Sequence, residues 1–445
     1  MEQNNQLQIG YGRVDVTPDY PVAIAGSAAK RISEGVLDPI YITCIALRQG
    51  DLTVLFATMD LVGSYEEFTE PVRLAIAQEL GLPRRRVLLN ATHTHSSVSA
   101  RDLNNHGIRR FYEDFLRKAL ACAKEAMADL APAEPYYGSI ETEGMVWVRH
   151  YKMADGSFAG ANFGSFKNSA IVGHACEPDG QMQLLRFDRQ KARKKDVILM
   201  NFPAHATING SSVLLSADFP GPARDLVARE TGALVAYFIA GAGNQVPTSR
   251  IPEECFSKDY RVYGEKVGRI ACRGLENMTR IENPILRYSE KCFVGESNKT
   301  GLERSEDALA VSAIWKTVGG RATPEGKKAA KEYGFSSVYA VTAILNRMKF
   351  EPTRTLELHA LAIGNVSMIF APYEMFGQSA AAIKRGSPYD MTFVVSCSQN
   401  HDGYLPSTLG WELGCYEAQI TRYAPGTAER LVEAYVAMLE EMKES

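Results

Sequence analysis

The sequence predicts an α/β protein in which mixed β-sheets are flanked by helices, forming one large domain over residues 1–445. Short apolar runs typical of buried strands alternate along the chain with amphipathic patterns typical of helices. The clearest case is the order strand, helix, strand over residues 54–58, 66–80 and 87–91. Polar residues follow several of these strands directly, as they do at the ligand-binding edge of an α/β sheet.

The first third of the chain alternates strands with helices. The expected elements are strands at 8–16, 40–48, 54–58 and 87–91, and helices at 66–80 and about 108–130. Gly81 and Pro83 stop the first helix. The βαβ unit that results would place Asp60, which follows the first of its two strands, beside the residues that follow the second.

The rest of the chain continues this alternation. The expected elements are strands at 137–151, 196–202, 234–239, 285–294, 356–363, 366–370 and 392–396, and helices at about 221–230 and 259–278, from 416 and from 427. Gly364 and Asn365 favour a two-residue hairpin turn between two of these strands. Residues 297–350 are strongly charged with a helical pattern, and they predict a helical insertion placed over the core like a lid.

Composition excludes several classes of partner. The chain is 45% hydrophobic and 23% charged, with a formal net charge of -3, so neither nucleic acid nor an anionic membrane surface is expected as a partner. No stretch reaches the 18 or so apolar residues of a membrane helix, so stable membrane insertion is not expected either.

The cysteines and the N-terminus predict a cytoplasmic protein. Eight cysteines are scattered without CxxC or regular spacing, as expected of reduced core residues. The first residues lack the basic and apolar regions of a secretory leader.

Residues 87–97, VLLNATHTHSS, join an apolar strand to two histidines. If the chain stays extended, side chains alternate between faces, so His93 and His95 point to the same side and can address one site. Hydrogen-bonded structural histidines at a strand end explain a bare HxH about as well.

Other expected strand ends supply partners for these histidines. The metal-capable residues that follow apolar strands are Asp60, His93, His95, His205, Glu374 and the segment 401–404. Two or three imidazoles with one carboxylate are ligands of the kind that hold catalytic zinc, which keeps one position for water or substrate. Four other histidines are interpreted as ordinary: His106, His150, His174 and His359.

Several motifs together resemble the neutral/alkaline non-lysosomal ceramidase family. They are GRVDVTP at 12–18, ATHTHS at 91–96, FPAHATIN at 202–209, SADFPG at 216–221, IAGAGNQVP at 239–247, GYLPS at 403–407 and Tyr416-Glu417. Their order along the chain is that of the family, and THTHS is the most specific of them.

The resemblance implies a set of site residues. It implies that a Zn²⁺ ion is held by His93, His205, Glu374 and Tyr404, and that His95 and Arg149 hold the substrate carbonyl or the developing oxyanion. Because metal-bound imidazoles normally donate their second N–H to a carboxylate or carbonyl, Asp60 and Asp218 are expected as supporting groups or proton acceptors.

One position departs from the family pattern. Ceramidases have a serine, a proposed nucleophile, where this chain has Val246. A valine cannot attack a carbonyl, so metal-activated water is the expected nucleophile. Compared with the family's long members, we expect this chain to lack the C-terminal β-sandwich domain.

The sequence therefore favours a zinc-dependent hydrolase that cleaves an amide, or less readily an ester, in a small soluble acylated substrate. Two alternatives stay open: true ceramidase activity, and a non-catalytic relative that binds metal without turnover. Manganese or iron could also use a His/Glu ligand set.

Overall fold

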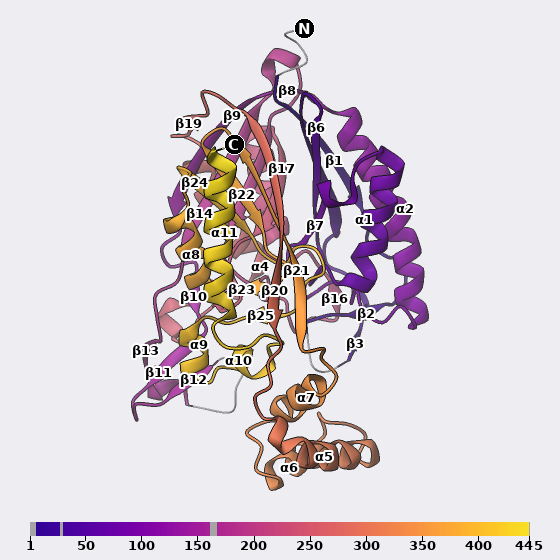
Figure 1. The fold of residues 1–445 in the computed structure, drawn as a ribbon, viewed down its shortest axis with the longest axis vertical. Coiled ribbons are helices and arrows are strands. Elements are labelled where there is room, and N and C mark those ends of the chain that lie inside the picture. The colour runs from indigo at the N-terminus through magenta and orange to yellow at the C-terminus, as the bar shows by residue number, and fades with distance from the viewer. Residues whose placement is uncertain (1–5, 27–29, 161–166, 445) are drawn as a thin grey trace.

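The computed structural model describes residues 6–26, 30–160 and 167–444, and it confirms the predicted α/β class. The first five residues, on which the expected lack of a leader partly rests, lie outside this range. Three mixed sheets form most of the molecule (Figure 1). The first contains, in spatial order, β7 (Val87–Ala91), β6 (Leu52–Met59), β5 (Tyr41–Gln49), β1 (Gln8–Asp15) and β8 (Ala131–Pro132). The second contains β17 (Leu234–Ile239), β15 (Val197–Phe202), β14 (Gln181–Asp188), β9 (Glu134–Glu141) and β19 (Thr279–Arg280). The third contains β20 (Leu286–Glu296), β21 (Thr353–Ile363), β22 (Val366–Phe370) and β24 (Met391–Val395).

The three sheets enclose one apolar core. Phe56 of the first sheet, Phe238 of the second and Phe370 of the third belong to the same buried cluster. The ring of Phe56 lies 5.7 Å from each of the other two rings, measured between centroids. A strand that is buried on both faces has apolar residues at nearly every position, and these continuous apolar runs are the pattern that predicted the strands from the sequence.

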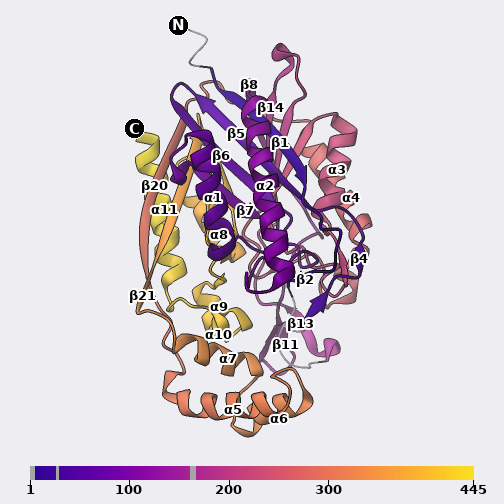
Figure 2. The same cartoon turned by 90° about the vertical axis from the view of Figure 1, so that its right-hand side faces the viewer.

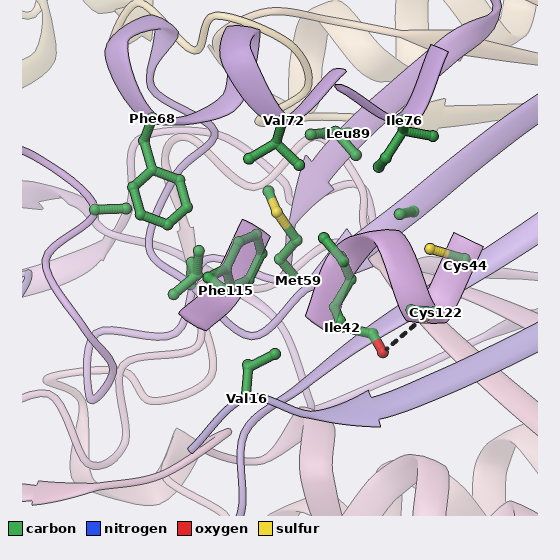
Figure 3. Packing of buried hydrophobic residues seen from close by; sticks show 14 of the residues in the cluster. Val16, Ile42, Cys44, Met59, Phe68, Val72, Ile76, Leu89, Phe115 and Cys122 are labelled. Carbon is green, nitrogen blue, oxygen red and sulfur yellow. Dashed lines mark hydrogen bonds between the residues drawn. The ribbon is translucent and has the colours of Figure 1, made fainter. Parts of the chain in front are cut away.

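A pair of helices packs on the outer face of each sheet (Figures 1 and 2). The pairs are α1 (Glu66–Leu80) with α2 (His106–Ala128), α3 (Pro220–Thr231) with α4 (Tyr260–Gly274), and α8 (Gly377–Gly386) with α11 (Thr427–Glu444). In the first pair, Phe68, Val72 and Phe115 project onto the sheet among residues such as Met59 (Figure 3). The helices are amphipathic because only this inner face is buried.

The same arrangement of strand, helix and parallel strand occurs once in each sheet. The three units are β6-α1-β7, β15-α3-β17 and β22-α8-β24, and in each unit the two strands pair in parallel. Their edge strands meet: Asn90 bridges to Ser398, and the Ser396 N–H donates to the Ile239 carbonyl at 3.0 Å. The carboxyl ends of all six strands therefore open onto one region, where the fold rule for α/β sheets places ligands.

The histidine pair after β7 reaches this region by a turn and not by strand alternation. β7 ends at Ala91, and His93 has φ 65°, in the left-handed region. A non-glycine residue in this region is strained, and such residues gather at functional sites. A positive φ is also found at three other non-glycine residues near these strand ends, Asp218, Cys397 and Asn400.

The charged segment after residue 296 forms three helices outside the three sheets. They are α5 (Ser305–Thr317), α6 (Pro324–Glu332) and α7 (Val338–Arg347). They lie beyond the ends of β20 and β21, at the lower end of the molecule (Figures 1 and 2). A separate apolar cluster that includes Trp315 and Phe335 holds them together.

Short elements complete the region around the strand ends. They are β2 (Ala23–Ile24) with β3 (Arg31–Ile32), β4 (Gly35–Val36) with β16 (Leu214–Leu215), β10 (Trp147–Val148) with β18 (Gln245–Val246), β23 (Glu374–Met375) with β25 (Tyr404–Leu405), the sheet of β11 (His150–Met153), β12 (Phe158–Gly160) and β13 (Ile171–His174), and the helices α9 (Thr408–Glu412) and α10 (Tyr416–Ile420). Within the described residues, no helix combines the length and the apolar character needed to cross a bilayer.

Candidate active site

Three histidines from two sheets meet at the joined strand ends. His93 and His95 follow β7, and His205 follows β15. The Nε2 atoms of His93 and His95 are 3.3 Å apart, and one ring nitrogen of each of the three residues lies within 4.8 Å of the others. The chain thus brings together the three imidazoles that the sequence singled out.

Backbone carbonyls hold all three rings from behind. The Nδ1 atom of His93 donates to Val62, that of His95 to Gly26 at 3.0 Å, and that of His205 to Ala242. A carbonyl oxygen only accepts, so each Nδ1 carries a proton and each Nε2 is the ring nitrogen left for another partner.

Glu374 supplies a carboxylate to the same place. Its Oε2 lies 3.2 Å from Nε2 of both His93 and His205, and its Oε1 lies 3.4 Å from Nε2 of His401. Glu374 is 6% exposed, so water cannot solvate its charge. The cluster therefore contains three imidazoles, a carboxylate and a fourth imidazole at the edge.

The protonation states suit metal binding. Burial, Arg149 and His93 lower the pKa of His205 to about 4, and burial also lowers the pKa values of His95 and His401. Burial alone would raise the pKa of Glu374, but His93 and the other histidines hold it well below its usual range. Burial opposes a proton on His93, but Glu374 raises the pKa of that ring well above its usual value. A metal ion would take the place of this single proton, since ligands must be deprotonated.

The donor set fits a zinc ion. Zinc ligands lie 2.0–2.1 Å from the metal, so in a tetrahedral site they are roughly 3.3 Å from each other. The distances of 3.2 Å from Glu374 Oε2 to Nε2 of His93 and of His205 match this spacing, and Nε2 of His95 lies 3.3 Å from that of His93, beside these atoms. His205 Nε2 and Glu374 Oε2 are also buried without a hydrogen-bond partner among the described residues, as ligand atoms should be.

Tyr404 stands next to the carboxylate. It is the register partner of Glu374 in the β23–β25 pair, and its ring stacks 6.4 Å from that of His205. Burial and the Glu374 charge raise the pKa of Tyr404 well above its usual value, so the phenol offers a neutral hydroxyl. The aromatic contacts continue from Tyr404 to Tyr416 and then to Tyr339 of α7, with centroid distances of 5.9 and 5.2 Å.

Arg149 is fixed by a buried ion pair. Its Nε donates to Glu417 at 2.7 Å and its Nη2 to the Gly243 carbonyl at 2.8 Å. His150 contacts the other oxygen of Glu417 at 2.9 Å, and Cys415 lies close enough to make a second cluster of metal-capable groups. Because Arg149 already occupies Glu417, this second cluster is an ion-pair network that orients Arg149 beside Tyr404.

We expect the variant Glu417→Gln to lower the free energy of unfolding at pH 7 by about 3–5 kcal/mol, because it leaves the buried Arg149 without a counter-charge. The side chains of Arg149 and Glu417 are 5% and 1% exposed. Arg149 and His150 overcome the effect of burial and lower the pKa of Glu417 below its unfolded value. The stabilisation is therefore complete above about pH 4.3 and is lost as the pH falls below that value.

Urea unfolding at pH 7 and at pH 4 measures this effect. The exposed Glu412→Gln on α9 is the matched control, and it should change stability by less than about 0.5 kcal/mol. A Glu417→Gln variant that matches this control at pH 7 would contradict the assignment.

Asp60 and Asp218 lie behind the cluster. The carboxylate of Asp60 pairs with both Nη atoms of Arg224, at 2.8 and 2.6 Å, and accepts from the Thr92 hydroxyl at 3.3 Å. Burial raises the pKa of Asp218 to about 7, against the hydrogen bonds from the backbone N–H groups of Asn209 and Phe219. The structure gives neither carboxylate a hydrogen bond to a histidine ring within the described residues.

A cavity of about 1120 Å³ leads to the cluster. Its walls include His93, His95, Arg149, Glu374 and Tyr404 from the strand ends. Val246, which takes the place of the family's serine, also lies in the wall and offers no nucleophile. Residues of the α5–α7 segment, Arg321 and Tyr339 among them, also line the cavity.

The fold and the site define an α/β protein whose three sheets join around a buried histidine–glutamate cluster. Two solved structures share this fold. A neutral ceramidase from Pseudomonas aeruginosa matches with a TM-score of 0.70 and 17% identity, over 99% of this chain and 75% of that chain. A ceramidase complexed with C2 matches with a TM-score of 0.70 and 15% identity, over 99% and 76%. The chain therefore has a ceramidase-like fold. No family model and no curated protein matches it at the level of sequence.

Three residues that complete the site received no role from the sequence. His401 was counted among the strand-end residues but received no role, although it follows β24 in the way that His93 follows β7. Glu417 appeared only as part of the Tyr416-Glu417 motif and His150 was interpreted as ordinary, because Glu417 contacts Arg149 and His150 from 268 and 267 positions away. The signals were the position of His401 after an apolar strand and the place of Glu417 in that motif.

Proposed function

We propose that this chain is a zinc-dependent hydrolase that cleaves an amide bond, or an ester, in a small acylated substrate. The observation that supports it most strongly is the position of Glu374, whose Oε2 lies 3.2 Å from Nε2 of both His93 and His205, while Nε2 of His95 lies 3.3 Å from that of His93. His93, His205, Glu374 and Tyr404 would hold the metal. A bound zinc ion would supply Lewis acidity toward the substrate carbonyl and an acidified water as nucleophile.

The protein's own groups would orient the substrate and move protons. Because His95 has its proton on Nδ1, its Nε2 can accept a proton from the attacking water and pass it to the leaving group. In this tautomer the Nε2 atom of His95 cannot donate a hydrogen bond to an oxyanion. In our proposal, Arg149 therefore stabilises the oxyanion. The guanidinium carries a permanent charge, and Glu417 fixes its orientation before substrate binds, as electrostatic stabilisation requires.

We expect Val246→Ser to change turnover by less than about tenfold and to form no covalent acyl-enzyme, because water is the proposed nucleophile. Val246 pairs with Trp147 in the short β10–β18 ladder, so the substitution should leave the backbone in place. Mass spectrometry of the protein quenched during turnover checks for the acyl adduct. An adduct with a large gain in activity would show instead that the chain lacks only a serine nucleophile.

Ceramidase activity is the second candidate, and the fold favours it. The fold match covers nearly the whole chain. A comparison of ceramide in mixed micelles with short soluble amides of the same acyl group separates the two candidates. We expect faster turnover of the soluble amides, because polar and charged residues line much of the cavity.

A cytoplasmic location is part of the proposal. All eight cysteines are free thiols, and four of them are buried. Free thiols in this number are typical of proteins from a reducing compartment.

The decisive experiment measures metal and turnover together. We expect protein prepared without added chelator to contain about one zinc ion per chain and to hydrolyse members of a panel of N-acyl and ester compounds. Chelation should abolish turnover, and zinc should restore it. Manganese or iron in place of zinc would change the metal but keep the mechanism. Stoichiometric zinc without turnover would identify a non-catalytic metal-binding protein, and absence of metal would contradict the proposal.

A further inference from the structure

We infer that the substrate carries an anionic group, a carboxylate or a phosphate, that basic side chains around the cavity recognise. This inference rests on the proposed function, because it names the class of substrate for the same site. The basic residues in the cavity wall are Lys30, Arg31, Arg101, Arg149, Arg250, Arg321 and Arg422. The acidic residues in the wall are Asp102, Glu374 and Asp402.

The excess of positive charge is a local property of the cavity. The whole chain has 49 basic and 52 acidic residues, so an average surface of this protein would be slightly acidic. A concave site that concentrates one sign of charge raises the local concentration of ligands with the opposite sign. The bias therefore indicates an anionic ligand and not a general charge of the protein.

Two of the three carboxylates are already engaged. Glu374 faces the histidines. Asp402 is shared by Arg354, at 2.9 Å, and Arg422, at 3.4 Å. Arg149 is paired with Glu417, which lies outside the wall. Arg31, Arg101 and Arg321 have no ion pair within the described residues, and the third carboxylate of the wall, Asp102, is exposed.

Arg31 shows the imbalance most directly. Its Nη1 donates to the carbonyls of Gly210 and Ser212, both at 2.7 Å, and its Nη2 donates to Ala25 and, at 2.9 Å, to His95. All these partners are neutral. Burial lowers the pKa of Arg31, as expected for a partly desolvated cation without a counter-ion. An anion in the cavity would compensate a charge that lies directly behind His95.

Two further arginines of the cavity wall, Arg101 and Arg321, contact neutral groups. The guanidinium of Arg101 lies 3.5 Å from the ring centroid of Tyr65, and that ring packs 5.3 Å from His401. Arg321, which precedes α6, donates to the Thr342 hydroxyl at 2.9 Å. Aromatic and hydroxyl contacts orient a guanidinium without neutralising it, and so leave it able to bind a carboxylate or phosphate. The contacts of Arg101 and Arg321 are with an aromatic ring and a hydroxyl, and neither has an ion pair among the described residues.

Matched substrates test the inference on the zinc-loaded protein. N-acetylglycine is compared with N-acetylglycinamide, and N-acetylethanolamine phosphate with N-acetylethanolamine, so that each pair differs in one anionic group. We expect kcat/KM to favour the anionic member of at least one pair by about tenfold or more at low salt, and 0.5 M salt to reduce the preference. The pair with the larger preference distinguishes carboxylate from phosphate.

Two variants and a control test which arginines bind the anionic group of the substrate. Arg101→Gln and Arg321→Gln should each reduce the preference several-fold, and the double variant should reduce it below about threefold. Arg385→Gln, an exposed arginine on α8 outside the cavity wall, removes the same charge and should leave the preference and the activity unchanged. Turnover without preference for either anion would overturn the inference while the proposed function stands.

A binding measurement separates the two proposals if no turnover occurs. Calorimetric titration of the same four compounds into the zinc-loaded protein reports anion recognition without chemistry. Tighter binding of an anionic member that is weakened in the Arg101→Gln/Arg321→Gln variant would support the inference although the proposed hydrolysis has failed. Equal binding of both members of each pair would overturn the inference. An anion preference that the double variant keeps would also overturn it, because such a preference would arise at the metal.

Discussion

The variant Glu374→Gln should lose both bound zinc and activity. The substitution keeps the size of the side chain and removes the charge that lies 3.2 Å from His93 and His205. Loss of a supporting partner of a metal ligand typically costs 10–100-fold in affinity, so loss of a direct ligand should cost at least about 100-fold. Turnover should fall by about 10³-fold or more, since the metal provides several kcal/mol of transition-state stabilisation.

Competition with a zinc-binding dye measures the affinity, and elemental analysis measures the zinc content after dialysis. Glu412→Gln again provides the control, because its carboxylate is exposed and lies outside the cavity wall. If Glu374→Gln kept a full equivalent of zinc at wild-type affinity, Glu374 would not be a ligand.

A second large effect is expected at Asp60, on stability. Asn in place of Asp60 leaves the guanidinium of Arg224 buried without an anion, and the two side chains are only 0% and 2% exposed. Breaking a buried ion pair in this way destabilises a protein by about 3–5 kcal/mol. Urea unfolding of Asp60→Asn measures the loss. Asp225→Asn serves as the control, because its carboxylate is 61% exposed and pairs with Arg13 at the surface.

The same variant separates two roles for Asp60. If Asp60 supports the strand end, the folded fraction of Asp60→Asn should still bind zinc, and its turnover per folded molecule should fall by less than about tenfold. If Asp60 were a proton acceptor in the reaction, turnover per folded molecule would fall by about 10²–10⁴-fold. The bidentate contact with Arg224 favours the supporting role.

Much of the fold follows from local pattern. The helix expected at 66–80 is α1, with the same bounds, and the strand expected at 87–91 is β7. These elements are recognisable because Gly81 ends the helix in a left-handed cap and because the strand is apolar on both faces. The idea that polar residues after apolar strands share one site depends only on this pattern. The structure brings His93, His205 and Glu374 together as that idea requires.

The local sequence pattern does not predict how the three strand–helix–strand units pack against one another. No repeat is visible in the sequence, although the strand–helix–strand arrangement occurs in all three sheets. Their junction depends on single long-range contacts such as Asn201 Nδ2 to the Val394 carbonyl. The orientation of the histidine pair could not be predicted from the sequence either. The expected alternation along an extended strand does not direct His93 into the site, because the chain turns there and His93 adopts a positive φ.

The α5–α7 segment leaves and rejoins the β20–β21 hairpin at neighbouring points, which makes it easy to exchange during evolution. β20 and β21 pair along their whole length up to Glu296 and Thr353, and the Ser297 N–H donates to the Pro352 carbonyl at 2.9 Å. The two points where the segment leaves the hairpin are thus adjacent, and the segment has an apolar cluster of its own. Chain that enters and leaves at neighbouring points is readily exchanged during evolution, as domain insertions are. A lineage could replace this module, and Arg321 and Tyr339 with it, and so change the cavity wall while the strand ends that hold the histidine–glutamate cluster stay untouched.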